Sequence, residues 1–301
     1  MTRLELPVLR MRSKLFVPAS RPELFDKAMR SAADALSFDL EDAVEESRKG
    51  EARQLLADFF ASLPPENTRQ MVVRVNGVRT VHFDQDMAMV VAGRAQVANV
   101  PMLEGGDDVV HAAQTLARLE RETGRSAPVG ILANIESPRA LRFVAEIALA
   151  HPRVIGLQIG FGDLFSPYGI DSRDEAAAQS VRLAVRLAAA EAGISAYDGA
   201  FVNIADPEGF RADAMAALRM GFSGKSCIHP TQIAMANEVF RPTDAQIAHA
   251  VKVVAAARDA LGRGVGAFVV DGKLVDGPFI AEAERILSIA GWPAVDPQRR
   301  E

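Results

Sequence analysis

The chain has 301 residues, of which 49% are hydrophobic and 24% are charged. At roughly 150 residues per domain this length allows about two domains or one large barrel, and the composition excludes a disordered or fibrous chain. The net charge of −5 argues against a protein whose main task is to neutralise a nucleic-acid backbone. The single cysteine, Cys227, excludes an internal disulfide and a metal site built from several thiolates.

The N-terminal segment does not have the pattern of a targeting signal. It carries charged residues and Pro7 where a signal peptide needs an uninterrupted apolar stretch. Charged residues also interrupt every apolar stretch before it reaches the ~18 residues of a membrane span. We therefore expect a cytoplasmic protein with no membrane segment and no nucleic-acid partner.

Short apolar runs alternate with longer amphipathic stretches along most of the chain, which is typical of α/β proteins. The runs predict strands at 14–18, 35–39, 71–75, 96–100, 129–135, 154–159, 194–197 and 224–228. The stretches between them predict helices at 22–32, 46–60, 107–123, 138–148, 174–192, 207–220 and 231–239. The run at 129–135 is nearly all apolar, as in a parallel strand covered on both faces. The pattern predicts a (β/α)8 TIM barrel over residues 1–241.

Residues 242–301 do not continue this alternation of strands and helices. They predict a helix at 244–261, a hairpin around Asp271-Gly272 and a last helix at 278–290. Such a segment is too short to bury a large core of its own. We expect a small C-terminal helical and hairpin extension that acts as a lid or oligomerisation element.

Polar residues close several predicted strands. In a TIM barrel the catalytic residues lie at the carboxyl ends of the strands. The polar residues at these ends include Asp39, Glu41, Asp42, Arg74, Glu136 and Asp163. Glu136 and Asp163 close adjacent strands and would repel each other unless a cation joined them. Ligation by oxygen alone favours Mg²⁺, so the sequence predicts a Mg²⁺ site on Glu136 and Asp163.

Each of these residues has a structural alternative. Glu136 could cap the helix that starts at Pro138, and Asp163 could cap a turn. Arg74 could be a buried ion-pair partner, although its planar fork suits a carboxylate or an enolate oxygen. His229 follows the last strand and could reach the same rim, but a structural role is favoured for it. Neither a Walker A motif nor a complete dinucleotide loop occurs, so nucleotide chemistry has little support.

Ordered motifs span nearly the whole chain. They are RSKLFVP at 12–18 with Arg21-Pro22 and Lys27-Ala28, FDLEDA at 38–43 with Ala52-Arg53, RVNG at 74–77, IESP at 135–138, Gly162-Asp163, and GFSGKSCIHP at 221–230. Together they resemble the citrate lyase β-subunit-like branch of the HpcH/HpaI aldolase/citrate lyase superfamily, which includes malyl-CoA and citramalyl-CoA lyases. The resemblance implies a TIM barrel, Mg²⁺ on Glu136 and Asp163, a substrate-binding Arg74, and homotrimers or hexamers.

The resemblance also implies a residue shared between subunits. In the CoA lyases a C-terminal segment covers the neighbouring subunit's site and contributes an aspartate, which Asp276 resembles. We assign Arg21 and Lys27, with Arg12 nearby, to the CoA phosphates, and a solvated helix face is the alternative for this basic cluster. The remaining substrate or CoA contacts that we assign are Phe16, Glu41 and Asp42.

The expected function is that of a Mg²⁺-dependent carbon–carbon lyase. Its substrate would be a short, carboxylated 3-hydroxyacyl-CoA of malyl-CoA or citramalyl-CoA type, and its products acetyl-CoA and a 2-oxo acid. The alternatives are a malyl-CoA-type thioesterase, a CoA-independent 2-oxo-acid aldolase, and a non-catalytic CoA-ester-binding subunit. Three positions depart from the family pattern. Ala19-Ser20 stands where a glycine is usual, Met102 where a lysine is common, and Gly277 where a bulkier residue is common. These departures bear on the substrate more than on the reaction type.

Overall fold

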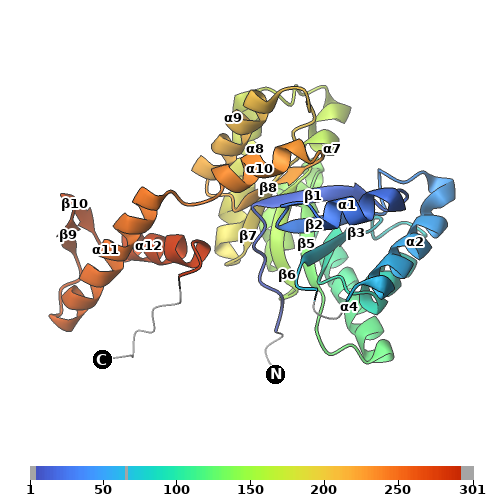
Figure 1. The fold of residues 1–301 in the computed structure, drawn as a ribbon, viewed down its shortest axis with the longest axis horizontal. Helices are drawn as coiled ribbons and strands as arrows, with labels where there is room; N and C mark the ends of the chain where they lie inside the picture. Colours follow the sequence, from blue (N-terminus) through green and yellow to red (C-terminus); the bar gives the residue numbers. More distant parts are fainter. Residues whose placement is uncertain (1–4, 65–66, 293–301) are drawn as a thin grey trace. The chain divides into compact units, whose positions relative to one another are not determined.

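A computed structural model describes residues 5–64 and 67–292. The chain divides into two compact units, Met1–Phe240 and Arg241–Glu301. Figure 1 shows the first unit as strands surrounded by helices and the second as a group of two helices and two short strands.

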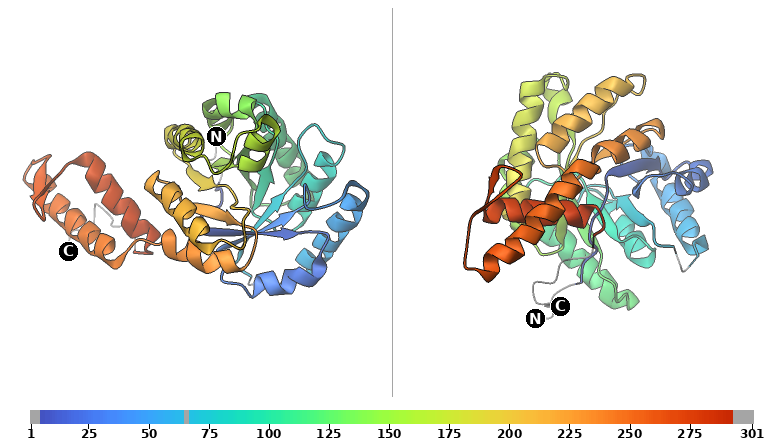
Figure 2. Two further views of the ribbon diagram at one scale, coloured as in Figure 1. Left: turned by 90° about the horizontal axis from the view of Figure 1, so that it is seen from above. Right: turned by 60° about the vertical axis from the view of Figure 1, so that its left-hand side comes forward.

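Eight parallel strands close into a barrel in chain order, with β8 pairing back to β1 (Figures 1 and 2). They are β1 (Ser13–Pro18), β2 (Ala35–Asp39), β3 (Gln70–Arg74), β4 (Val97–Val100), β5 (Gly130–Ile135), β6 (Val154–Ile159), β7 (Ser195–Asp198) and β8 (Gly224–Cys227). All eight overlap the strands that the apolar runs predict. The predicted TIM barrel is confirmed.

Helices surround this barrel. They are α1 (Phe25–Met29), α2 (Lys49–Ser62), α3 (Phe83–Ala92), α4 (Gly106–Thr123), α5 (Pro138–Arg142), α6 (Val144–Leu149), α7 (Phe161–Phe165), α8 (Glu175–Glu191), α9 (Pro207–Arg219) and α10 (Thr231–Val239). The predicted helix at 138–148 is two helices, because Phe143 leaves helical geometry at φ −105° and ψ 20°. In the described part of the chain, no helix combines the length and the apolar character needed to cross a membrane.

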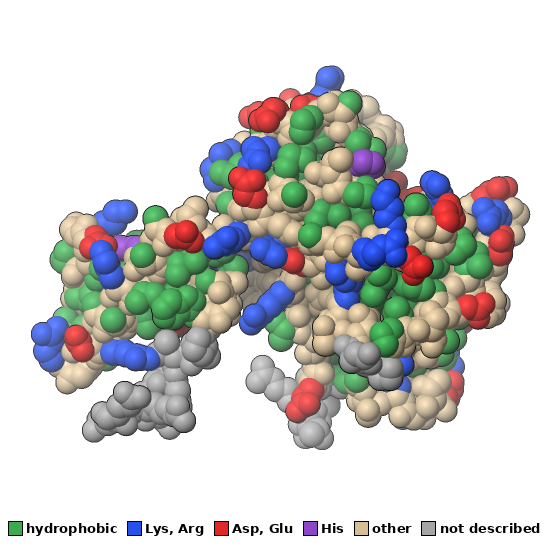
Figure 3. Space-filling model, in the orientation of Figure 1, with side chains coloured by type: hydrophobic (Ala, Val, Ile, Leu, Met, Phe, Trp, Pro, Cys, Tyr) green, Lys and Arg blue, Asp and Glu red, His purple; other side chains and the backbone are tan. Residues whose placement is uncertain are grey.

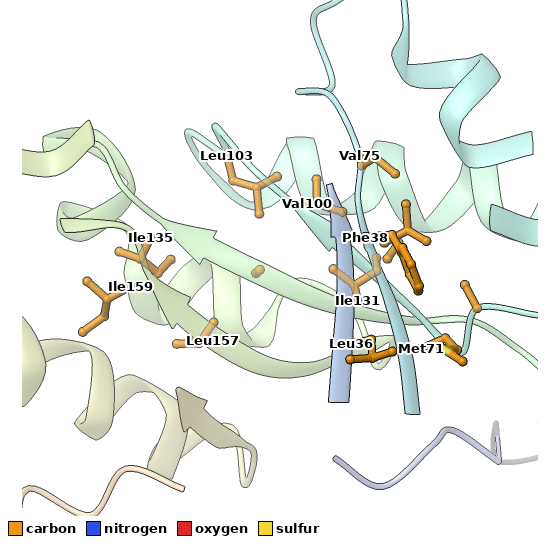
Figure 4. Close-up of a cluster of buried hydrophobic side chains, with 14 of the residues drawn as sticks. Leu36, Phe38, Met71, Val75, Val100, Leu103, Ile131, Ile135, Leu157 and Ile159 are labelled. Atoms are coloured by element: carbon orange, nitrogen blue, oxygen red, sulfur yellow. The ribbon is translucent and has the colours of Figure 1, made fainter. Parts of the chain in front are cut away.

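The main hydrophobic core lies between the strands and the helices (Figure 4). Alternate residues of each strand point to this side, so Leu36 and Phe38 of β2 face the helices. The Phe38 ring meets Phe25 of α1 at 5.2 Å and Phe60 of α2 at 5.5 Å, edge to face in both cases. Burying such a side chain contributes about 2 kcal/mol of transfer free energy, which holds the helices against the sheet.

The inside of the barrel changes character along its axis. A small apolar cluster fills one part of it: Leu9, Met11, Ala35, Val72, Val97, Leu132 and Tyr197. Nearer the carboxyl ends of the strands, the buried side chains are polar: Lys14, Ser37, Asn99, Asn134, Gln158 and Ser226. Because branched apolar residues usually dominate a TIM-barrel interior, this polar layer points to a role in the site above it.

The second unit consists of α11 (Asp244–Gly262), the hairpin β9 (Phe268–Val270) and β10 (Lys273–Val275), and α12 (Gly277–Ile289). Asp271 and Gly272 join the strands with φ of 49° and 79°, as a tight two-residue hairpin turn requires. The unit has a small core of its own. Hydrophobic side chains also lie on its surface (Figure 3), including Leu274, which is 64% exposed, and Phe279, which is 51% exposed.

Candidate functional site

The candidate site lies at the carboxyl ends of the barrel strands. Arg74 is the last residue of β3 and stands in register with Asp39, the last residue of β2. Glu136 follows β5 directly, and Asp163 lies in the first turn of α7, which follows β6. The barrel therefore brings these four side chains to one rim, because the carboxyl ends of all strands in a parallel barrel lie at the same end.

Carboxylates of the β2 end hold the Arg74 side chain. Its Nε and Nη2 donate to the two Asp39 carboxylate oxygens at 2.8 and 2.6 Å. Its Nη1 lies 2.8 Å from Glu41 Oε2 and 3.1 Å from Asp42 Oδ2. Burial alone would lower the pKa of Arg74, but these partners raise it, so the guanidinium stays charged. Arg74 thus forms the ion pairs that the structural alternative predicted.

The loop after β2 is itself fixed by hydrogen bonds. Asp39 accepts from the backbone N–H groups of Glu41 and Ala43 at 3.0 and 3.2 Å, in addition to its bonds from Arg74. The buried Lys49, at the start of α2, donates to the Leu40 and Glu41 carbonyls at 3.1 Å each. Arg74 is therefore oriented by a rigid partner rather than by a mobile surface loop.

Glu136 is buried and held by two donors. Its Oε1 accepts from the backbone N–H of Met102 at 2.6 Å, and its Oε2 accepts from Asn134 Nδ2 at 3.2 Å. The side chain that caps α5 is Ser137, which accepts from the Ala140 N–H at 3.0 Å. The interpretation of Glu136 as a helix cap is therefore wrong.

The rim carries an excess of negative charge. Arg74 is a cation that acts on its carboxylates, which are Asp39, Glu41, Asp42, Glu136 and Asp163, and burial lowers the pKa of the neighbouring Lys14. Burial raises the pKa of Glu136 to about 7, against the opposing effect of the Met102 N–H, and the charge of Asp163 adds to the rise. Burial also raises the pKa of Glu41 to about 9. Such a cluster binds either protons or a cation.

The Glu136 and Asp163 pair fits a hard cation such as Mg²⁺. Both supply oxygen, and Gly160 leaves room for Glu136, because a Cβ at that position would lie 2.5 Å from Glu136 Oε2. In residues 5–64 and 67–292, no three His, Cys, Asp or Glu side chains are grouped so as to hold a metal ion. Mg²⁺ commonly uses one or two protein carboxylates and fills its other positions with water and substrate oxygens.

The predicted CoA-binding residues are distributed over two ends of the barrel. Phe16 is half-buried, and its ring centroid lies 5.0 Å from Arg74 Cζ. Arg21 and Lys27 are exposed after β1, where Arg21 pairs with Glu23 at 2.9 Å. Arg12 precedes β1 and pairs with Asp34 at 2.8 Å, before the start of β2. Arg12 therefore does not join the cluster, because it lies at the opposite end of its strand.

Asp276 lies in the second unit, at the N-terminal end of α12. Its side chain is half-buried, and Oδ1 is buried without a hydrogen-bond partner among the described residues. His229 lies within 2.9 Å of the Thr231 hydroxyl at the start of α10, in agreement with a structural role.

The sequence interpretation missed the residues beneath the rim. They are Lys14, Asn99 and Asn134, which are buried inside the barrel. Lys14 is hydrogen-bonded to Asn99, and Asn99 to Asn134. A signal was available for Lys14, because strand alternation places it on the same face as Phe16. A charged residue at an inward position of a barrel strand needs a polar partner in the interior.

Comparison with known proteins identifies the family. Residues 12–230 match the model of the HpcH/HpaI aldolase/citrate lyase family. The chain belongs to this family. The matched segment includes Arg74, Glu136 and Asp163 and ends before Asp276.

Relatives cover nearly the whole chain. The L-malyl-CoA/beta-methylmalyl-CoA lyase of Cereibacter sphaeroides is 34% identical over 297 residues, or 92% of this chain and 93% of the relative. The (3S)-malyl-CoA thioesterase of the same organism is 36% identical over 280 residues, or 93% and 94% of the two chains. The crystal structure of CitE from Mycobacterium tuberculosis in complex with magnesium, acetoacetate and coenzyme A has a TM-score of 0.73 at 34% identity. The match covers 93% of this chain and 97% of CitE.

These findings confirm the family and the enzyme class, carbon–carbon lyase. The magnesium named in the CitE complex supports the predicted metal. The relatives differ in the bond they cleave, since one is named a lyase and another a thioesterase.

Proposed function

We propose that this protein is a Mg²⁺-dependent lyase that cleaves a short, carboxylated 3-hydroxyacyl-CoA of malyl-CoA or citramalyl-CoA type. The products would be acetyl-CoA and a 2-oxo acid. One observation carries the proposal: a charged, firmly oriented Arg74 shares a rim with the buried Glu136 and with Asp163. We also propose that the enzyme works in the cytoplasm as a homotrimer or hexamer.

Glu136 and Asp163 would hold the Mg²⁺ ion. When bound, Mg²⁺ supplies Lewis-acid chemistry at the hydroxyl and carboxylate oxygens of the substrate's 2-hydroxy-acid end. Glu136 enters this role already oriented by the Met102 N–H and Asn134. Asp163 is exposed at the start of α7, where it would be open to incoming substrate.

Arg74 would stabilise the charge that the bond cleavage creates. The hydroxyl loses its proton, the carbon–carbon electron pair moves toward the thioester, and negative charge develops on the thioester oxygen. A preorganised guanidinium donor at this oxygen lowers the barrier because it needs no reorientation during the reaction. Asp39 supplies that preorganisation through its two bonds to Arg74.

Asp276 of a neighbouring subunit would move the proton. The cleavage releases one proton from the hydroxyl and consumes one at the enolate carbon, so a single carboxyl group that exchanges protons balances the reaction. Arg21 and Lys27, both exposed, would meet the CoA phosphates. Phe16, Glu41 and Asp42 would line the remainder of the substrate site.

A thioesterase is the second candidate function. It is favoured by the 36% identity to a protein named (3S)-malyl-CoA thioesterase. In that reaction water attacks the thioester carbonyl, and Arg74 would stabilise the oxyanion that forms there.

Product analysis tests both candidates. The protein is incubated with malyl-CoA or citramalyl-CoA and Mg²⁺, and glyoxylate, pyruvate, acetyl-CoA and free CoA are followed separately. We expect acetyl-CoA together with a 2-oxo acid, and no turnover after chelation of the metal. Free CoA with a hydroxy acid would instead identify a thioesterase. Absence of turnover of either ester would overturn the proposal.

A further inference from the structure

A buried lysine lies beneath the candidate site. Lys14, in β1, is 1% exposed and points into the barrel. Its Nζ donates to Asn99 Oδ1 at 3.2 Å and lies 4.1 Å from the centroid of the Phe16 ring. An amine buried in a barrel core costs free energy unless its surroundings use it, so its partners indicate what it does.

A continuous chain of hydrogen bonds leads from this lysine to Glu136. Asn99 Nδ2 donates to Asn134 Oδ1 at 2.6 Å, and Asn134 Nδ2 donates to Glu136 Oε2 at 3.2 Å. The chain crosses from β1 to β4 and then to β5. Each asparagine accepts with its oxygen and donates with its nitrogen. Asn99 Nδ2 also donates to the Leu132 carbonyl at 3.0 Å, so Lys14 and this carbonyl together fix the direction of the bonds that follow.

The direction of these bonds matters at Glu136. With Asn134 donating to Oε2 and Met102 donating to Oε1, both carboxylate oxygens are held in place and each keeps a lone pair. We propose that Lys14 is a positioning residue that holds Glu136 in its metal-binding orientation through Asn99 and Asn134. This inference rests on the proposed function, because it assigns Glu136 to the metal.

Lys14 is linked to Glu136 by hydrogen bonds through Asn99 and Asn134. The Phe16 ring centroid lies 4.1 Å from Lys14 Nζ and 5.0 Å from Arg74 Cζ. Burial, and then the charge of Arg74, lower the pKa of Lys14, while Asp39, Glu136 and Cys227 raise it. A neutral amine can accept as well as donate, but Asn99 Nδ2 already donates to Leu132 and Asn134, so Lys14 Nζ stays the donor to Asn99 Oδ1 in both protonation states.

The test measures Mg²⁺ binding directly. Isothermal titration of the substrate-free protein gives the Kd for Mg²⁺ of the wild type and of Lys14→Met, a variant of similar length without a donor. Loss of an outer partner of a metal ligand weakens metal binding by about 10-fold or more, and we expect this loss here.

Ser226→Ala provides the matched control. Ser226 is the register partner of Lys14 on β8 and is equally buried. Its hydroxyl has no hydrogen-bond partner within the described part of the chain and is not connected to Glu136. Its removal should leave the Mg²⁺ affinity unchanged.

Asn134→Ala removes the last link without touching the lysine. Because Asn134 itself donates to Glu136, this variant should weaken Mg²⁺ binding at least as much as Lys14→Met does. The double variant should bind no more weakly than Asn134→Ala alone, since both changes break the same chain. If Lys14→Met does not fold, Asn134→Ala still tests the chain, and a wild-type Kd in it would overturn the inference.

The two proposals fail in different ways. If the wild type binds no Mg²⁺, or if Glu136→Gln binds it as well as the wild type, the proposed metal site is wrong. If the wild type binds Mg²⁺ and Glu136→Gln does not, but Lys14→Met and Asn134→Ala bind with wild-type affinity, the metal site is correct and the positioning role of Lys14 is wrong.

Discussion

At the scale of single residues, the support of Glu136 does not depend on the side chain at one position that departs from the family pattern. Met102 has a φ of 52°, in the left-handed region, and its N–H holds Glu136 Oε1. Its side chain is 44% exposed and does not take part in this contact. Replacement of the lysine that is common at this position therefore preserves the support of Glu136 and removes one positive charge from an already acidic rim.

The first prediction concerns the two metal-binding carboxylates. Glu136→Gln and Asp163→Asn should each abolish activity and Mg²⁺ binding while the protein stays folded, because a hard cation requires the charge that each amide lacks. Turnover, titration calorimetry and circular dichroism check the three parts. Unchanged Mg²⁺ affinity in both variants would show that these carboxylates have structural roles only.

Arg74 gives the second prediction. In Arg74→Lys a point charge replaces a planar fork and cannot reproduce the paired bonds to Asp39. We expect kcat to fall by roughly 100-fold or more, as for loss of an oxyanion donor, with little change in Mg²⁺ affinity. Steady-state kinetics at saturating Mg²⁺ measure the loss. Wild-type turnover would leave Arg74 with the ion-pair role alone.

At the scale of elements, a buried ionic network ties two helices to two strands. Lys225 of β8 donates to Asp198 of β7 and to Asp213 of α9, at 2.6 Å each. Arg182 of α8 donates to Asp198 at 2.9 and 3.0 Å. Strand alternation points Lys225 toward the helices, where Phe210 of α9 lies under it, and away from the barrel interior. The network therefore serves packing rather than the site.

The third prediction tests this network. Lys225→Met leaves two carboxylates with Arg182 as their one remaining cation in the network, and removal of one member of a buried ionic group costs about 3–5 kcal/mol. Urea unfolding should show a clear loss of stability, with catalysis retained at low temperature. Arg211→Ala is the control, since it breaks the exposed Arg211–Glu238 pair between α9 and α10 and should not shift the midpoint. Equal midpoints for wild type and Lys225→Met would contradict the argument.

The sequence predicts some elements better than others, for physical reasons. Strands such as Val154–Ile159 are buried on both sides, and an apolar run that only Gln158 interrupts marks both of their ends. Helix α3 was not predicted, because it lacks a side-chain cap and follows a polar loop. Helix α7 has five residues, too few for a periodic pattern.

At the scale of the whole molecule, the barrel determines which site residues can be found in the sequence. Arg74, Glu136 and Asp163 were predicted because each lies at the end of a strand or shortly after it, and all strand ends meet at one rim. The support of Glu136 by Lys14, Asn99 and Asn134 was not predicted. Lys14 lies 85 positions from Asn99, and Asn99 lies 35 positions from Asn134. Only the closure of the barrel brings the three side chains together in its interior.

The C-terminal unit has more hydrophobic surface than its own core can cover. Val269 is 67% exposed, Leu274 64% and Trp292 49%, around a core of a few small side chains. Exposed apolar groups in a unit of this size favour association with another surface. The last prediction tests whether that surface is the rim of a second copy of this chain.

Asp276 should act across a subunit interface, so that the enzyme is an obligate oligomer. Asp276→Ala and Glu136→Gln should each be inactive alone, and mixing them under subunit-exchange conditions should restore part of the activity. Recovery is expected because some mixed interfaces join an intact metal site on one subunit to an intact Asp276 on its neighbour. Turnover of the mixture, with exchange verified by native mass spectrometry of differently tagged subunits, is the measurement. If dissociated monomers turn over normally, or if proven exchange never restores activity, the site is not shared and Asp276 is an ordinary residue at the start of α12.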